Sequence, residues 1–301
     1  MKPILKPIST GTHIQIKNIL FTTDFSDAAK AAAPYAAALA KRYGAKLYAL
    51  HVRSPIVNTL TLPENWRALE KIAEIEAQRE KFALVHTFAG MHPEILINEG
   101  DLWPNIKAAI QEHDIDMIVM GTRGRSGIGK FLLGSAAEEI FRQAPCPVLT
   151  VGPHSPAVPK SSGEITRILL ATDFGPESQA AASYAISLAQ ECQAYLTLLH
   201  VIDAPKTGDL VHPSELSSSS GRMLRHLVPL QAELWCVPDY VVEYGAPAEK
   251  ILEIAAKRDA ELIVLGVHKP TGLYGAATHL PMAVAHKVVS LAPCPVLTVR
   301  G

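Results

Sequence analysis

The chain has 301 residues, of which 48% are hydrophobic and 19% charged, a length that suits one large or two ordinary globular domains. The formal net charge is −1 and no block of basic residues occurs, which argues against a nucleic-acid-binding surface. No apolar run approaches the roughly 18–20 residues that span a bilayer and the first residues show no secretory signal, so we expect a cytoplasmic protein without a membrane partner.

Apolar runs and amphipathic stretches alternate from residue 19 onward. Residues 19–25 predict a short buried strand. Ser26 is placed to cap a helix over Asp27–Tyr43, which Gly44 would end. In the same way, later strands are predicted at 47–52, 95–97, 115–120 and 147–151, and later helices at 63–88, 103–113 and from 135 onward. The apolar face of the helix at 63–88 is expected to include Leu69, Ile72, Ile75 and Ala83.

This alternation implies a parallel sheet with right-handed crossovers. In open sheets of this kind, ligands lie at the carboxyl ends of the strands, where the strand order switches. Asp24 and Gly121 both follow predicted strands and would therefore lie at that edge.

The pattern occurs twice in the chain. Asp24 recurs as Asp173, 149 residues later, within nearly the same run of letters, and residues 144–151 recur letter for letter at 292–299. We therefore expect two copies of one domain, at 14–152 and 164–301, joined by a Pro- and Ser-rich linker at 153–163.

Two further expectations concern the second copy and the join. The serine run 217–220 is predicted to be a mobile surface loop. The apolar strands Val148–Val151 and Val296–Val299 should form sheet edges. We predict that the two copies cover these edges against one another about a pseudo-two-fold axis.

A glycine-rich loop follows the fourth strand, with the spacing Gly121-x2-Gly124-x9-Gly134-Ser135. Glycine allows close approach of other groups, successive loop N–H groups can hold an anion, and the next helix adds its own free N–H groups. A glycine-rich turn without a ligand remains the alternative, since such loops are frequent in α/β folds.

Two better-known phosphate-binding motifs nearly match this loop. Residues 124–131 resemble a Walker A loop, but Phe131 stands where Ser or Thr would hold the metal. Residues 127–132 begin a dinucleotide fingerprint, which Leu132 breaks. The chain is therefore neither a standard P-loop ATPase nor a Rossmann dehydrogenase.

Taken together, these motifs resemble the universal stress protein family. They are an aspartate after the first strand, a His-Val pair ending the second, the glycine spacing after the fourth, and the ending Ala-Pro-Cys-Pro-Val-Leu-Thr-Val. The resemblance covers nearly the whole chain. It implies an α/β fold of two tandem doubly wound domains. Each would have a five-stranded parallel sheet in the order 3-2-1-4-5, and the two would form an intramolecular pseudo-dimer.

The resemblance also implies ATP in the first copy, with Mg²⁺ or Mn²⁺ carried by its phosphates. Asp24 would lie near the ribose and phosphates, and Val52 would contact the adenine through its backbone. Arg123 would neutralise phosphate charge, with a solvated surface arginine as the alternative. The implied nucleotide-binding residues are Thr22, Thr23, Asp24, Val52, Met120, Gly121, Arg123, Gly124, Gly134, Ser135 and Ala136.

The second copy departs from this pattern. Lys269 replaces the second glycine of the loop, and Pro270, which has no N–H group, follows it. Met282 and Ala283 stand where the first copy has Gly134 and Ser135. We therefore expect one nucleotide per chain, in the first copy.

Histidines near the altered loop raise the question of a metal. His268, His279 and His286 could together bind one, but their spacings of 11 and 7 match no local zinc motif, and the metal assignment stays open. His51 and His200 are expected to be structural residues at strand ends.

The expected function is ATP-dependent stress response or regulation, through conformation or partner binding. No residue is assigned a catalytic role, because neither a well-placed general base nor a Walker B carboxylate is visible. Two alternatives remain: a slow metal-dependent ATPase with Asp24 on the metal, and an assembly module with a vestigial pocket. Expected partners are ATP, an unidentified regulatory protein and a second tandem chain. The four cysteines show no CxxC pair and are expected to be buried free thiols in a reducing compartment.

Overall fold

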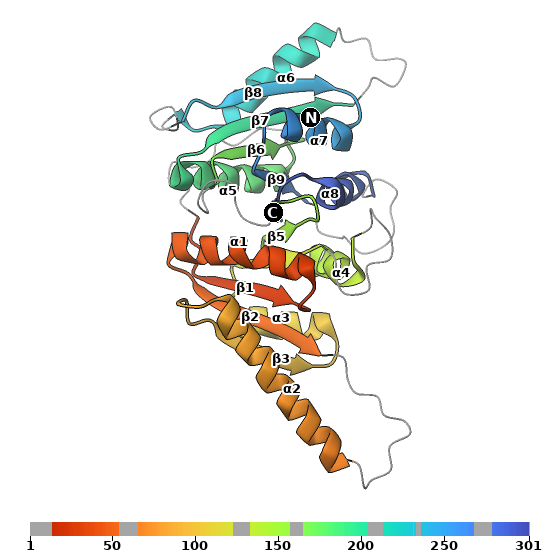
Figure 1. The fold of residues 1–301 in the computed structure, drawn as a ribbon. Helices are drawn as coiled ribbons and strands as arrows, with labels where there is room; N and C mark the ends of the chain where they lie inside the picture. The colour runs from red at the N-terminus through yellow and green to blue at the C-terminus, as the bar shows by residue number, and fades with distance from the viewer. Residues whose placement is uncertain are drawn as a thin grey trace.

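Strands and helices alternate along the whole chain in the computed structural model, which describes residues 14–53, 66–122, 133–156, 165–203, 213–230, 232, 236–267 and 279–300 (Figure 1). The first half contains β1 (Asn18–Thr23), α1 (Asp27–Tyr43), β2 (Lys46–Arg53), α2 (Trp66–Thr87), β3 (Glu94–Glu99), α3 (Leu102–Glu112), β4 (Met117–Gly121), α4 (Ser135–Gln143) and β5 (Val148–Val151). The second half contains β6 (Arg167–Ala171), α5 (Pro176–Cys192), β7 (Tyr195–Ile202), α6 (Pro213–Leu227), β8 (Asp239–Tyr244), α7 (Pro247–Lys257), β9 (Leu262–Gly266), α8 (His279–Leu291) and β10 (Val296–Val299).

All the strands belong to one ten-stranded sheet that runs the length of the molecule (Figure 1). Its order is β3-β2-β1-β4-β5-β10-β9-β6-β7-β8. Neighbouring strands within each half are parallel, and only the central pair, β5 and β10, is antiparallel. Each half therefore has the order 3-2-1-4-5, and the predicted fold class is confirmed.

The central seam joins the two halves symmetrically. Leu149 of β5 faces Leu297 of β10 in the register. The Thr150 hydroxyl donates to the Val296 carbonyl at 3.1 Å, and the Thr298 hydroxyl donates to the Val148 carbonyl at 3.2 Å. These equivalent bonds on either side of the Leu pair define a pseudo-two-fold axis. The prediction that the two apolar edges cover one another is confirmed.

Helices cover both faces of the sheet. One apolar core lies under α1, α2, α5 and α6 and the other under α3, α4, α7 and α8, as the members of the two clusters show. Each core contains residues from both halves, so the halves share their buried interior as well as their sheet.

The caps of α1 follow the sequence expectation. The Ser26 hydroxyl accepts a hydrogen bond from the Ala29 N–H at 3.3 Å, which satisfies one of the donors left free at a helix N-terminus. Gly44 follows the helix with φ +61°, the left-handed conformation that glycine adopts without strain. The helix spans Asp27–Tyr43 as predicted.

The serine run 217–220 lies inside α6, so its prediction as a loop is wrong. Leu216, Ser220, Leu224 and Leu227 recur at helical spacing, and Ser220 is only 7% exposed. The Ser219 hydroxyl returns to the Leu216 carbonyl at 2.9 Å, which satisfies the side chain within the helix. The prediction relied on the serine content and overlooked the leucines at helical spacing on both sides of the run.

The apolar face expected for α2 is also partly wrong. Ile72 and Ile75 are 51% and 47% exposed. Leu84, near the end of α2, and Phe88, the residue after the helix, are both buried. The helix carries two apolar stripes, and only the one that reaches Leu84 packs on the sheet. The rest of α2 projects from the end of the molecule (Figure 1).

All four cysteines are free thiols, as expected, but only Cys294 is fully buried and the other three are half-buried. Burial raises the pKa of Cys146 to about 12, so this thiol is protonated and poorly nucleophilic. Within the ranges given above, no helix is both long and apolar enough to cross a membrane.

Candidate functional site

The carboxyl ends of β1 and β4 form the centre of the candidate site in the first half. These two strands are neighbours although they are not consecutive, so the strand order switches between them. The Gly134 N–H donates to the Thr122 carbonyl at 2.9 Å, which places the start of α4 at the end of β4. The turn after β1 and the start of α4 therefore flank the end of β4, at the edge where such sheets bind ligands.

The turn after β1 is held by its own side chains. The Thr23 hydroxyl accepts from the Phe25 N–H at 2.9 Å, and the Asp24 carboxylate accepts from the Ser26 N–H at 3.0 Å. Phe25 has φ +62°, unusual for a residue with a large side chain. This geometry orients the Asp24 carboxylate, while the Thr23 hydroxyl is already used inside the turn.

His51 supports the same turn from the neighbouring strand. Its Nδ1 lies 2.7 Å from the Thr23 carbonyl, and because a carbonyl can only accept, Nδ1 carries the proton. The Phe25 ring packs edge-on against the imidazole with centroids 4.7 Å apart. His51 is thus a structural residue, as expected. Sequence reasoning missed Phe25, although its recurrence as Phe174 after the second aspartate was a signal.

The second half repeats this arrangement. Phe174 has φ +65°, its N–H donates to the Thr172 hydroxyl at 3.0 Å, and His200 Nδ1 lies 2.8 Å from the Thr172 carbonyl. Burial lowers the pKa of His200, an effect that the hydrogen bond to Thr172 and the nearby Asp173 oppose. The expected structural role of His200 is therefore borne out by its contacts.

Gly121 is required by packing between β4 and α1. A Cβ on Gly121 would lie 2.6 Å from the carbonyl carbon of Ala28, a distance that backbone atoms cannot accommodate without moving. Gly266 is in the same position, with Glu177 O only 2.6 Å from its missing Cβ. Both halves therefore need this glycine whether or not they bind a ligand, which explains why Gly266 remains in the altered second copy.

The N-terminus of α4 offers free hydrogen-bond donors to the site. Gly134 is the N-cap residue with φ −62° and, as a glycine, provides no side-chain cap. The amides that follow, beginning with those of Ser135 and Ala136, have no partner within the helix because they belong to its first turn. Both residues are exposed. Free N–H groups at the positive end of a helix dipole favour a bound anion such as phosphate.

The second half lacks these donors at the equivalent place. Ser135 corresponds to Ala283, since 135 + 148 = 283, but α8 already begins at His279. The helix therefore starts 283 − 279 = 4 residues earlier, about 6 Å along its axis. The amides of Ala283 and Val284 lie beyond the first turn and take part in intrahelical bonds. This difference agrees with the expected loss of phosphate binding in the second copy.

The remaining predicted residues divide into three groups. Thr22 and Met120 are buried, with 7% and 4% exposure, so their side chains belong mainly to the core. Val52 is half-buried near the end of β2, in register with Asn98 of β3. Arg123 and Gly124, together with Lys269, Pro270 and His268 of the second copy, lie outside the described residues.

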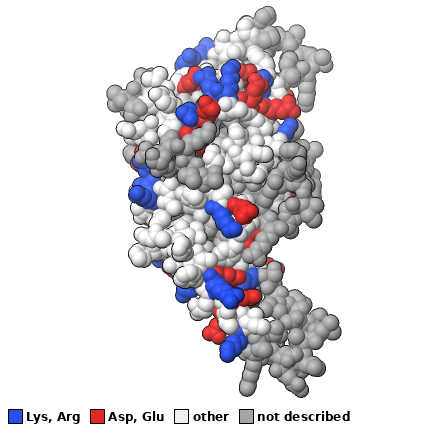
Figure 2. All heavy atoms as spheres, viewed as in Figure 1, with Lys and Arg blue, Asp and Glu red and all other residues white. Residues whose placement is uncertain are grey.

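Charged groups near the site do not form a metal centre in the part of the chain that is described, where no three His, Cys, Asp or Glu side chains cluster suitably. On the face shown in Figure 2, the described basic and acidic side chains are interspersed. Glu138 in the first turn of α4 pairs with Arg142 at 3.0 Å, so its carboxylate is partly neutralised next to the N-terminus of the helix.

Comparison with known proteins gives the same picture over the whole chain. The family described as "Universal stress protein family" matches residues 15–152 and again 164–300. A universal stress protein of Mycolicibacterium smegmatis is 28% identical over 296 residues, which cover 94% of this chain and 96% of that protein. One from Thermus aquaticus is 36% identical over 135 residues, covering 45% of this chain and 98% of that protein.

Among solved structures, a universal stress protein from Archaeoglobus fulgidus DSM 4304 superposes with a TM-score of 0.68 at 21% identity. The superposition covers 95% of this chain and 99% of that one, and it establishes the shared fold. The resemblance noted from the sequence motifs is confirmed.

Proposed function

The chain belongs to the universal stress protein family, and from this premise we propose that it is a regulatory protein that binds one ATP, in its first half. The observation that carries the proposal is the uncapped N-terminus of α4, which lies at the end of β4 beside the turn that orients Asp24. This is the place and the chemistry that a phosphate chain requires.

In this proposal each element has one task. The amides of Ser135 and Ala136 hold phosphate oxygens, with the Ser135 hydroxyl and Arg123 as further donors. Asp24 accepts from the ribose hydroxyls or holds the Mg²⁺ or Mn²⁺ that accompanies the phosphates. Val52 supplies backbone groups to the adenine. The binding unit is the first repeat, residues 14–152, and the second repeat, residues 164–301, is its pseudo-symmetric partner across the linker at 153–163.

The function is regulation by occupancy rather than catalysis. Phosphoryl transfer needs a group that orients the attacking water and charges that stabilise the transition state. The described residues supply the phosphate donors and the Asp24 carboxylate, and His51 is used to hold the turn, with its Nδ1 on the Thr23 carbonyl and its Nε2 3.5 Å from Glu80. Bound ATP would instead favour one conformation of the α4 end, which a second chain or another regulatory protein could recognise. Free thiols, of which Cys146 is kept protonated by burial that raises its pKa, suit a cytoplasmic location.

Calorimetry of the full chain with ATP and Mg²⁺ tests the proposal. We expect a stoichiometry of one. Gly134→Val should abolish binding, because a β-branched side chain at the N-cap would block the approach of phosphate to the Ser135 and Ala136 amides. The matched control is Met282→Val, at the aligned position of the second half, which should leave the stoichiometry and affinity unchanged.

The outcomes separate the alternatives. Two nucleotides per chain, or tight binding by the Gly134→Val variant, would show that the phosphates are misplaced here. No binding at all would favour an assembly module with a vestigial pocket. Steady phosphate release over many turnovers, lost in an Asp24→Asn variant, would favour the slow metal-dependent ATPase.

A further inference from the structure

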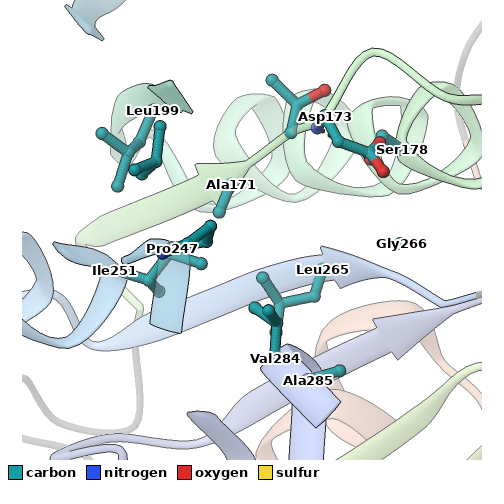
Figure 3. Close-up of a pocket in the computed structure, with 12 residues that line it drawn as sticks. Ala171, Asp173, Ser178, Leu199, Pro247, Ile251, Leu265, Gly266, Val284 and Ala285 are labelled. Atoms are coloured by element: carbon teal, nitrogen blue, oxygen red, sulfur yellow. Dashed lines mark hydrogen bonds between the residues drawn. The ribbon is translucent and has the colours of Figure 1, made fainter. Parts of the chain in front are cut away.

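A cavity of about 210 Å³ lies at the carboxyl ends of β6, β7 and β9 in the second half (Figure 3). It occupies the position in this half that the ATP site would occupy in the first. The space exceeds the roughly 150 Å³ cavity that holds benzene and falls below the 300–1,000 Å³ of a drug-sized site. Its volume therefore suits a ligand that has a single ring or two fused rings.

The walls of this cavity are aliphatic. Leu199, Ile251, Leu265 and Val284 point into it from β7, α7, β9 and α8 (Figure 3). Ala171 lies between them at the end of β6. A ligand in this space would gain stability by removing apolar surface from water.

The second half also differs from the first at positions that border the cavity. Ala171 stands where the first half has Thr22 (171 − 149), and Val284 where it has Ala136 (284 − 148). Each change removes a hydroxyl or adds methyl groups. The walls at these two positions are thus more apolar than in the first half, whereas Ser178, another lining residue, adds a hydroxyl where the first half has Ala29.

Among the residues that line the cavity, Thr172, Asp173 and Ser178 are polar, and Asp173 carries a carboxylate. Asp173 Oδ1 accepts from the Ser178 hydroxyl at 2.6 Å and from the Gly175 N–H at 2.9 Å. Ser178 replaces Ala29 of the first half, so the hydroxyl bond to the carboxylate is specific to the second half, whereas the Gly175 bond has a counterpart in the Ser26 N–H bond to Asp24. An ionised carboxylate has about four acceptor positions and can take a further hydrogen bond from a ligand.

Phosphate does not fit this environment. The early start of α8 removes the free N-terminal amides that would hold phosphate oxygens in the first half. The Asp173 carboxylate can instead accept a hydrogen bond from an N–H or O–H donor.

We propose that the second half binds an uncharged ring compound of one or two fused rings, whose N–H or O–H group donates to Asp173. This site lies beyond the proposed ATP site and does not depend on it. The chain would then combine two different small-molecule inputs in one pseudo-symmetric sheet.

The test uses the full chain and two probes, indole and indene, which have the same fused-ring shape but differ in the N–H group. Binding is measured by calorimetry and by saturation-transfer NMR. Indole should bind one site per chain about tenfold or more tighter than indene, the range expected for a hydrogen bond to a charged group. Asp173→Ala should remove that preference. The matched control, Asp24→Ala in the first half, should retain it.

Filling the cavity provides the second arm. Ala171→Leu should weaken indole binding at least about tenfold, which corresponds to 1.4 kcal/mol. Val284→Phe fills the space from α8 and replaces this variant if Ala171→Leu does not fold. Thermal unfolding monitors the fold of each variant.

Three results would overturn the proposal: no saturable indole binding at millimolar concentration, equal binding by both cavity-filling variants and the wild type, or direct competition between ATP and indole for one site. Failure of ATP to bind the first half would leave the indole result intact, so the two proposals fail separately.

Discussion

At the scale of single residues, the two packed glycines give the most direct test of how the structure is held. Gly121→Ala and Gly266→Ala should each lower the free energy of unfolding by at least about 2 kcal/mol, because the added Cβ would meet the backbone of α1 or α5. Urea unfolding without nucleotide measures the effect. Gly221→Ala in α6 is the control, since its Cβ would meet only Arg225 at 3.8 Å. Gly221→Ala should raise the free energy of unfolding by about 0.5–1 kcal/mol. A neutral Gly121→Ala would mean that this glycine serves only the loop.

His200 should make the stability of the fold depend on pH. Burial lowers its pKa in the folded protein below that of the unfolded chain, about 6.5. The folded state therefore binds fewer protons, and stability should fall as pH drops below about 6.5 until the lower folded pKa is passed. His200→Asn should reduce this slope between pH 7 and pH 5, as measured by urea midpoints. Replacing His226, an exposed residue of α6, should leave the slope in place.

The positions of single residues in the fold were predicted well at the ends of strands. Asp24 and Gly121 were placed correctly at the carboxyl ends of their strands, because alternation and glycine spacing specify strand ends. The left-handed backbone of Phe25 was missed, because it belongs to a turn held by a local bond from the Phe25 N–H to the Thr23 hydroxyl and by His51 of the neighbouring strand on the Thr23 carbonyl. Gly121 was interpreted as a phosphate contact, which stays a prediction, and the structure adds a packing role, because its backbone lies close to Ala28.

At the scale of elements, α2 carries two apolar stripes that should contribute differently to the free energy of unfolding. Leu84→Ala should lower the free energy of unfolding by about 2–5 kcal/mol, because Leu84 is only 1% exposed. Ile75→Ala, in the same helix but 47% exposed, should change it by less than about 0.5 kcal/mol. Chemical unfolding of the two variants decides between the stripes. A larger loss for Ile75→Ala would mean that the exposed stripe is covered in solution.

Periodicity predicted the existence of the elements better than their surroundings. The helix α1 matches its expected bounds because Ser26 and Gly44 mark both ends locally. The early start of α8 had a local signal that was overlooked, because Thr278, a residue type preferred at helix N-caps, directly precedes His279. Alignment with the first half placed the helix start at Met282 instead. The actual start decides which half offers free amides.

At the scale of the molecule, the sheet has two kinds of edge. The outer strands carry charge: Glu94 of β3 pairs with Lys46 at 2.7 Å, and Asp239 of β8 pairs with Arg258 at 2.7 Å. Charged edges resist pairing with other chains. The inner strands β5 and β10 have the same sequence, Val-Leu-Thr-Val, and bury all four residues. The apolar strands β5 and β10 are thus paired at the join, and the strands with charged side chains, β3 and β8, form the outer edges.

The last prediction tests that join. Leu149→Lys should lower the free energy of unfolding by at least about 3 kcal/mol, because Leu149 is 3% exposed and faces Leu297, so the ammonium group would be buried without a partner. Leu297→Lys should have the same effect, since the pseudo-two-fold axis makes the two positions equivalent. Leu96→Lys is the matched control, a leucine of the outer strand β3 that is half-buried and should lose less. Urea unfolding compares the three variants, and limited proteolysis within 153–163 shows whether the halves have separated. If Leu149→Lys and Leu96→Lys lose equal stability and neither exposes the linker, the seam does not hold the halves together.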